Sequence, residues 1–198
     1  MKKPVSLFYK ILILIVGFGL IAGFIVTMRA MEKKIPFEKE SNPLEIQNKN
    51  LSFQKQTKVI ITEVMSSNSR TIMDGSGFSS DWIEFYNMSD EIINLKGAGL
   101  STNVNEPMMW TFPVFEIGPK EYKIVYASGL NEVDSAGFLH LNFKLNAKLG
   151  ETLYFTSALG TLMSTIVIPT LDSDISYGMN EDGEWLYFNH PSPGKKNG

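Results

Sequence analysis

Residues 58–87 have the sequence KVIITEVMSSNSRTIMDGSGFSSDWIEFYN, in which two β-type segments flank a loop of small residues. The first segment, Val59–Met65, is rich in β-branched residues, and in the second, Trp82–Asn87, apolar residues alternate with polar or aromatic ones. A period of two predicts a strand that buries one face. Each segment also carries one glutamate, Glu63 or Glu84. The favoured interpretation is that each carboxylate accepts hydrogen bonds from backbone or loop groups and fixes a strand end. The alternative, if the two strands are neighbours, is that the carboxylates shift each other's pKa or bind a cation.

The chain that follows residue 87 continues as short β-type segments separated by turn signals, which is typical of all-β sandwiches and barrels. Residues 92–95 follow the second segment at hairpin distance, so we expect these two segments to pair. Strict alternation over residues 139–144 predicts a strand on which His140 faces solvent. The remaining expected strands are 109–112, 122–126, 151–155, 161–168, 175–179 and 185–188.

Composition excludes several classes of site. The chain has no cysteine, which removes disulfide frameworks, thiolate nucleophiles and cysteine-based metal sites. It has two histidines and no Gly-x-Ser-x-Gly motif, so nothing in the sequence supports a hydrolytic triad. We therefore expect no enzyme activity, no catalytic residue and no cofactor or metal site. Residues 58–198 hold nine Lys/Arg and seventeen Asp/Glu, a net charge of -8, which disfavours nucleic-acid binding.

The N-terminal part carries the signal for cellular location. Ile11–Met28 is free of charged residues and, as a helix, would be about 27 Å long, enough to cross a bilayer. It predicts an uncleaved signal anchor; the alternatives are a cleaved signal peptide or a buried soluble helix. A short tail, residues 1–10, would stay in the cytoplasm, and the chain after the anchor would lie outside it. Residues 29–57 are polar and lack a sustained apolar period, which is typical of a linker.

Five short motifs then occur in a fixed order. They are Val59–Val64, Asp81–Asn87, Ile93–Leu100, Gly150–Leu153 and Pro191–Asn197. In order and spacing they resemble the lamin-tail domain, over essentially all of residues 58–197. The resemblance implies an immunoglobulin-like β-sandwich with Greek-key connections. In bacteria, domains of this family look like extracellular or envelope modules, often attached to hydrolases, nucleases or CotH-type spore-coat kinase domains.

Two departures limit what the resemblance implies. No heptad rod precedes the domain, so a filament-forming lamin is not implied. Ala98 and Gly99 stand where the family commonly has an aromatic residue, which leaves the packing of that bend open.

We therefore expect a single-pass membrane protein whose extracytoplasmic domain is a non-catalytic interaction or scaffold module for another envelope protein or a wall component. The alternative is the targeting domain of a surface kinase or hydrolase whose catalytic part is missing or separate; nucleic-acid binding is a weaker third hypothesis. Aromatic residues such as Trp82 and Tyr86 would serve a sugar- or protein-binding surface if they face outward, and would otherwise belong to the core. The candidate structural or binding residues are Glu63, Trp82, Glu84, Tyr86, Asn87, Pro193, Gly194 and Asn197.

Overall fold

The computed structural model describes residues 58–198, which form strands and loops without a helix. No element in this part has the helical length and apolarity that crossing a bilayer requires. The predicted tail, membrane anchor and linker lie outside the described residues. The strands are β1 (Val59–Met65), β2 (Trp82–Asn87), β3 (Ile93–Asn94), β4 (Gly99–Ser101), β5 (Trp110–Thr111), β6 (Glu116–Ile117), β7 (Tyr122–Tyr126), β8 (Glu151–Thr156), β9 (Leu162–Ile168), β10 (Ser176–Met179) and β11 (Trp185–Phe188).

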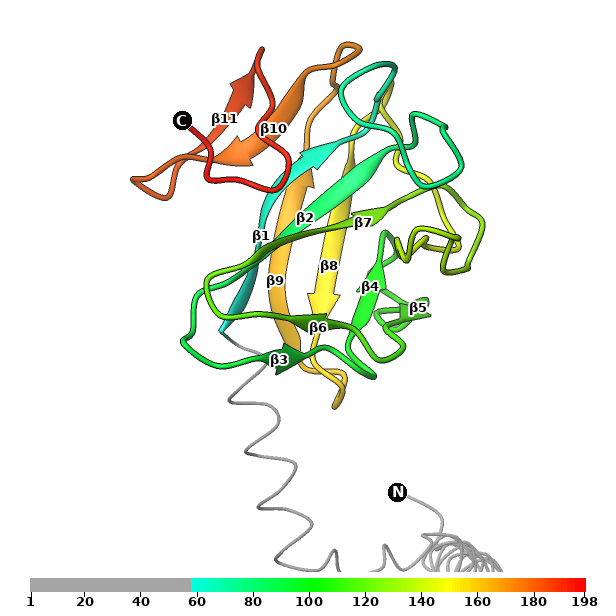
Figure 1. Ribbon diagram of the computed structural model, residues 1–198, viewed down its shortest axis with the longest axis vertical. Helices are drawn as coiled ribbons and strands as arrows, with labels where there is room; N and C mark the ends of the chain where they lie inside the picture. The colour runs from blue at the N-terminus through cyan, green and yellow to red at the C-terminus, as the bar shows by residue number, and fades with distance from the viewer. Residues whose placement is uncertain (1–57) are drawn as a thin grey trace, which may run out of the picture. The chain divides into compact units, whose positions relative to one another are not determined.

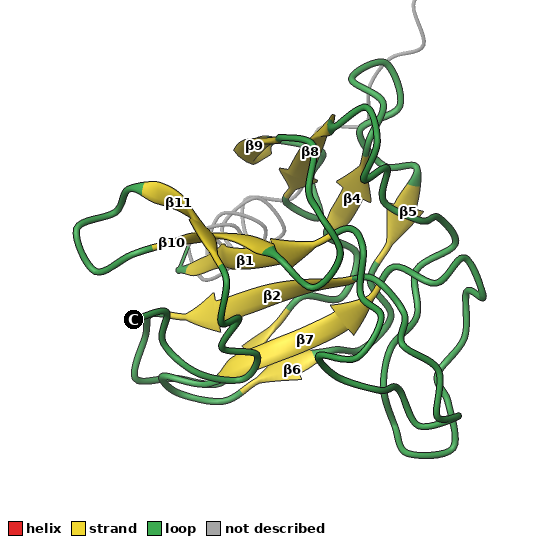
Figure 2. Cartoon of the chain, turned by 90° about the horizontal axis from the view of Figure 1, so that it is seen from above, coloured by secondary structure: helices red, strands yellow, loops and turns green. Residues whose placement is uncertain are grey.

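These strands form a β-sandwich, which confirms the all-β prediction. One sheet has the order β11-β10-β1-β2-β7 and the other β5-β4-β8-β9, while β3 and β6 pair separately. All the strand pairs are antiparallel. In Figure 1 the sheet with β1, β2 and β7 lies in front of β8 and β9, and Figure 2 shows from above that β1, β2 and β7 lie in one layer and β4, β8 and β9 in another. This arrangement is consistent with an immunoglobulin-like sandwich.

Apolar side chains from both sheets form one continuous core. Phe85 of β2 lies at its centre, with its ring 5.5 Å from that of Phe112 and 5.4 Å from that of Phe155 on β8, both edge to face. This geometry suits the aromatic quadrupole and adds to the stabilisation from burial. Ala98 is fully buried in the same core, so the bend after β3 packs without the aromatic residue that the family commonly has there.

Two hairpins join expected strands that follow each other in the sequence. β8 and β9 pair across a turn that ends in Gly160, and β10 and β11 pair across a turn that ends in Gly183. Both glycines have positive φ angles, 74° and 82°, a conformation that costs glycine little and other residues more. Turn chemistry in the sequence was therefore a sound guide to local pairing.

Three predictions about strands are wrong. In each case the structure depends on contacts between residues far apart in the sequence. Residues 92–95 do not pair with β2, because β3 pairs with β6 and β2 lies between β1 and β7. Strand β2 buries both faces, because Trp82 and Glu84 on one face are as inaccessible as Ile83 and Phe85 on the other. Residues 139–144 form isolated bridges instead of a strand, and His140 is buried instead of exposed.

Candidate functional site

Two glutamates occupy the middle of the larger sheet. Glu63 on β1 and Glu84 on β2 are directly opposed in the register, and both are 0% exposed. The pairing of β1 with β2 shifts between Ile61 and Glu63, so that Thr62 is an extra residue in β1. The Thr62 hydroxyl donates a hydrogen bond of 2.7 Å to Glu84 Oε1. The two strands are therefore neighbours, and Glu63 and Glu84 lie opposite each other.

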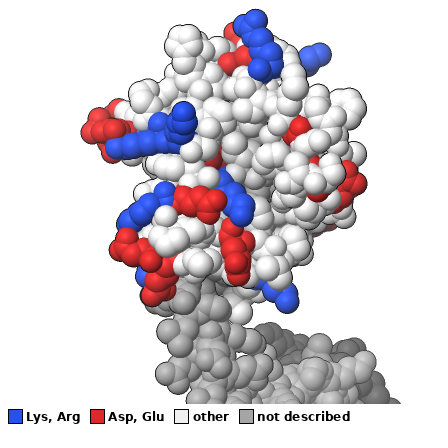
Figure 3. All heavy atoms as spheres, in the orientation of Figure 1, with Lys and Arg blue, Asp and Glu red and all other residues white. Residues whose placement is uncertain are grey.

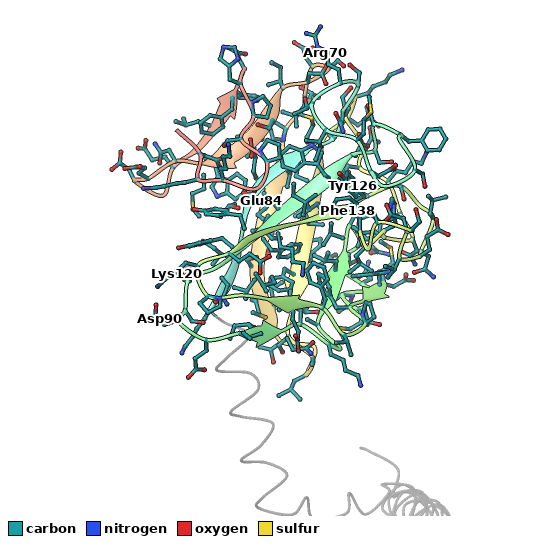
Figure 4. All side chains as sticks on the ribbon, in the orientation of Figure 1. Arg70, Glu84, Asp90, Lys120, Tyr126 and Phe138 are labelled. Atoms are coloured by element: carbon teal, nitrogen blue, oxygen red, sulfur yellow. The ribbon has the colours of Figure 1, made fainter. Side chains whose placement is uncertain are left out.

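The C-terminal segment, residues 189–198, covers this pair. The Gly194 N–H donates to Glu84 Oε2 at 2.6 Å, and the Ser192 N–H lies 3.5 Å from Glu63 Oε1. The side-chain amide of Asn197 donates to the carbonyl oxygens of Thr62 (3.0 Å) and Met179 (3.1 Å), which fastens the segment to β1 and β10. Figure 4 shows Glu84 between the C-terminal strands and β2. Gly194 has a φ of 80°, which explains a glycine at this turn.

Burial governs the electrostatics of the pair. It raises the pKa of Glu84 to about 7; the hydrogen bonds from Thr62 and Gly194 oppose the shift, and the charge of Glu63 adds to it. Burial also raises the pKa of Glu63, whose Oε1 accepts from the Ser176 hydroxyl while its Oε2 has no hydrogen-bond partner. Residues 58–198 contain no group of three or more side chains suited to a metal. The pair is therefore suited to holding a proton beneath the C-terminal segment.

The structure does not bring the other predicted residues to this pair, apart from Pro193 in the C-terminal segment. Trp82 packs with Met65 and Tyr126 in a second, smaller cluster. Tyr86 stacks on Tyr122 with ring centroids 4.2 Å apart. The Asn87 amide donates to the carbonyl oxygens of residues 91, 117 and 118 at 2.7–3.0 Å and so organises the turn after β2. Trp82 and Asn87 are thus structural residues, and Trp82 adds nothing to an exposed aromatic surface.

A second feature lies at one end of the sandwich, in the loops 66–81 and 127–144, here called the loop end. Three aspartates hold it. Asp74 accepts from the N–H groups of residues 76 and 78, and Asp134 from those of residues 75, 136 and 138. Asp174 accepts from the Ser69 hydroxyl and from the N–H groups of residues 69 and 70, and the Ser69 hydroxyl is the main reason that its pKa is lowered. The backbone N–H groups of these loops have no neighbouring strand to bond to. The three carboxylates accept their hydrogen bonds instead.

The two loops of the loop end also bind each other. The Gly75 N–H of the first loop donates to Asp134 Oδ2 of the second at 2.7 Å. The Tyr126 hydroxyl, at the end of β7, also donates to the Met73 carbonyl of the first loop at 2.8 Å. A Cβ atom on Gly75 would lie 2.6 Å from Asp134 Oδ2, so only glycine permits this approach. Figure 4 shows Tyr126 and Phe138 side by side at this end, and their rings meet edge to face at 5.5 Å.

The sequence analysis missed one cluster of polar side chains. His140 Nδ1 lies 2.8 Å from the Ser128 hydroxyl, and His140 Nε2 lies 3.2 Å from Asp134 Oδ2. The side chains of His140 and Asp134 are 0% and 1% exposed. Burial opposes ionisation of Asp134, but hydrogen bonds from Phe138, His140, Gly75 and Ala136 outweigh it and hold the pKa at about 2. No motif in the sequence marks these three residues, because loop geometry alone brings them together.

Comparison with known families gives one match. The model of the family described as Lamin Tail Domain matches residues 53–170, which is more than half of the chain. The chain belongs to the lamin tail domain family. A search of curated proteins found no match. The two buried glutamates of this lamin tail domain lie within the matched residues, whereas the C-terminal segment that covers them follows the match.

Proposed function

We propose that this lamin tail domain belongs to a membrane-anchored bacterial envelope protein, lies outside the cytoplasm and binds another envelope protein or a wall component through its loop end. The uncharged run Ile11–Met28 supports the anchor, and the absence of cysteine is ordinary for a bacterial surface protein. The family match supports the domain type.

The observation that carries the proposal is the apolar surface of the loop end. Exposed large apolar residues occur on both of its loops, and Phe78 is the most accessible of them at 67%. Such groups gain free energy when a partner removes them from water. The exposed residues are Met73, Phe78, Leu130, Val133 and Phe138.

The loop end is also braced before any partner arrives. The hydrogen bonds from Gly75 to Asp134 and from Ser69 to Asp174 join residues far apart in the sequence. Those to Asp74 close the first loop on itself. A surface that is already ordered loses less conformational entropy on binding than a flexible one. The order already present in these loops favours a binding face over a pair of ordinary connecting loops.

The loop end lies away from the residue at which the described chain begins. Strand β1 runs from Val59 to Met65, a length of about 20 Å, and the first loop begins where it ends. Figure 1 shows this direction, with β1 starting at the lower end of the domain and ending at the upper end. A domain tethered through its N-terminal side would thus present the loop end to its surroundings.

Surface charge supports a partner other than nucleic acid. On the face shown in Figure 3, positive and negative side chains intermingle at the lower left, where Lys120 pairs with Asp90 at 3.3 Å. This face shows no stripe of basic residues for a phosphate backbone. With a net charge of -8 over residues 58–198, the domain would repel such a backbone.

The test compares captured envelope material between two variants of the full-length chain. In the first, Phe78, Leu130 and Phe138 are changed to serine; in the control, the exposed Leu149, Leu162 and Val167, which lie outside the loop end, are changed to serine. Each chain is immobilised and exposed to detergent-solubilised envelope, and bound material is identified by mass spectrometry. We expect the wild type and the control variant to bind the same envelope component, and the first variant to bind none of it. Equal recovery from all three would refute a binding role for the loop end.

Topology is tested separately by adding protease to intact cells. Removal of residues 58–198 is expected, and complete protection would overturn the proposed location. Stoichiometric recovery of a kinase or hydrolase in the capture experiment would favour the alternative in which the domain targets a separate enzyme.

A further inference from the structure

Ser128, His140 and Asp134 form a hydrogen-bonded chain whose order follows from their protonation. Asp134 is ionised and accepts N–H groups from both loops, so it can only accept from the histidine as well. His140 Nε2 therefore carries the ring proton. In the neutral ring Nδ1 is then an acceptor, and the hydroxyl of Ser128 donates to it across 2.8 Å. A serine hydroxyl that donates to a histidine oriented by a carboxylate is the arrangement that activates a nucleophile.

The base in this chain is held firmly. The Leu139 carbonyl accepts the Tyr126 N–H, and the Leu141 N–H donates to the Tyr126 carbonyl, so the backbone on both sides of His140 is bonded to β7. The imidazole also stacks on the Tyr126 ring, with centroids 5.3 Å apart. In serine hydrolases it is commonly Nε2 that faces the serine, whereas here it is Nδ1; either nitrogen can take up a proton.

Ser128 differs from the other two residues because it is only half-buried and lines a cavity. The cavity has a volume of about 390 Å³, within the range of small-molecule sites. Phe78 and Leu130 supply apolar walls, and Lys144 supplies a cation. A Cβ atom on Gly129 would lie only 3.7 Å from Lys144 carbon atoms, so the lysine stem lies next to the Ser128–Gly129 peptide. Asp74 and Asp81 line the same cavity, and the positive charge of Lys144 opposes the rise in the pKa of Asp81 that burial causes.

We propose that Ser128 is the nucleophile of an ester-hydrolysing site, with His140 as its general base and Asp134 as a positioning residue. The cavity is lined by apolar side chains and by the carboxylates of Asp74 and Asp81, and its size and lining suit small carboxylic esters that carry no negative charge. This inference goes beyond the proposed binding function and does not depend on it. It also departs from the expectation, drawn from sequence, that the chain is not an enzyme.

The reaction balances without a cofactor. Ser128 Oγ attacks the ester carbonyl carbon, and its proton passes to His140 Nδ1. The tetrahedral intermediate then breaks its bond to the alcohol oxygen, which leaves with the proton from His140. Water attacks the acyl-Ser128 ester in the same way, and the carboxylic acid leaves as Ser128 regains its proton. Ester and water thus give acid and alcohol.

The experiment treats the folded full-length chain with a fluorophosphonate probe and follows adduct formation by intact mass and peptide mapping. We expect one adduct, on Ser128, that forms at least about a hundredfold faster than on heat-denatured chain, the lower end of what general-base catalysis contributes. Ser128→Ala should abolish labelling, whereas Ser173→Ala, at an exposed serine outside the loop end, should not. Hydrolysis of p-nitrophenyl acetate should follow the same order.

The peptide map of the wild type keeps the test decisive even if the Ser128 variant fails to fold. The proposal is refuted if the folded wild type forms no adduct while a reference serine hydrolase does, or if the adduct lies on another residue. Asp134→Asn provides a separate readout of positioning through the ¹⁵N shifts of the His140 ring. We expect the ring proton to move from Nε2 to Nδ1 and labelling to fall; an unchanged tautomer with unchanged labelling would remove Asp134 from the mechanism.

Discussion

The buried glutamate pair makes the stability of the domain depend on pH in a direction opposite to that of an ordinary surface acid. Glu84 has a pKa of about 7 in the folded state, compared with 4.5 for an unperturbed glutamate. Between these two values the folded domain keeps a proton that the unfolded chain releases. The free energy of unfolding therefore falls as the pH rises from 4.5 to 7, by about 3 kcal/mol for a shift of this size. Glu63, whose pKa is also raised, contributes in the same direction.

The variant Glu84→Gln isolates this effect. A glutamine can accept the Gly194 N–H through its oxygen and donate to the Thr62 hydroxyl through its amide, as a protonated Glu84 would. Near pH 4.5 we expect the variant and the wild type to be about equally stable. Near pH 8 we expect the variant to be more stable by about 3 kcal/mol, or roughly 10 °C in melting temperature.

Thermal unfolding of the full-length chain, followed by tryptophan fluorescence at several pH values, measures the difference. Glu106→Gln is the matched control, because it removes the same charge from an exposed position. The control should follow the wild type at every pH. If Glu84→Gln also loses stability in parallel with the wild type from pH 4.5 to 8, Glu84 does not hold a proton in the folded domain and the argument from burial fails.

Three further substitutions test the loops and the C-terminal segment. Gly75→Ala places a Cβ atom 2.6 Å from Asp134 Oδ2 and should destabilise the domain by about 1–3 kcal/mol in thermal melts. Asn197→Ala leaves the Thr62 carbonyl without its donor and should cost about 1–3 kcal/mol and speed tryptic cleavage after the exposed lysines of the C-terminal segment. Asp174→Asn should lower the melting temperature at pH 7, and its difference from the wild type should shrink steadily as the pH falls below the pKa of an ordinary aspartate, because the lowered pKa of Asp174 stabilises the fold only while the carboxylate is ionised.

How far the sequence predicted this structure depends on the range of the interactions involved. Strands β1, β2 and β7 and the β10–β11 hairpin follow from alternation and turn residues, which are local signals. The burial of Glu84 does not follow from local signals. It depends on a segment about 110 residues away that covers an otherwise open face of β2. Alternation identified the two faces of that strand but could not show that both are covered.

His140 illustrates a second limit. Alternating residues imply opposite faces only where the backbone is a continuous strand, and residues 139–144 touch β7 through isolated bridges. Because the backbone here is not part of a continuous strand, His140 can point inward. There Asp134 and Ser128 provide hydrogen-bond partners for both ring nitrogens. A buried imidazole requires such partners, and a single sequence does not reveal that two loop residues provide them.

The residues beyond the family match are needed to close the same fold. The match ends at residue 170, yet β10 forms the ladder with β1 directly opposite Glu63, and the Ser176 hydroxyl donates to that carboxylate. Without residues 171–198, β1 would become an edge strand, and Glu63 and Glu84 would face water, where ionised carboxylates are well solvated. Their raised pKa values depend on this cover. The C-terminal residues and the two glutamates therefore form one structural unit. A domain that ended at residue 170 would lack β10 and β11, and its glutamates would no longer have raised pKa values.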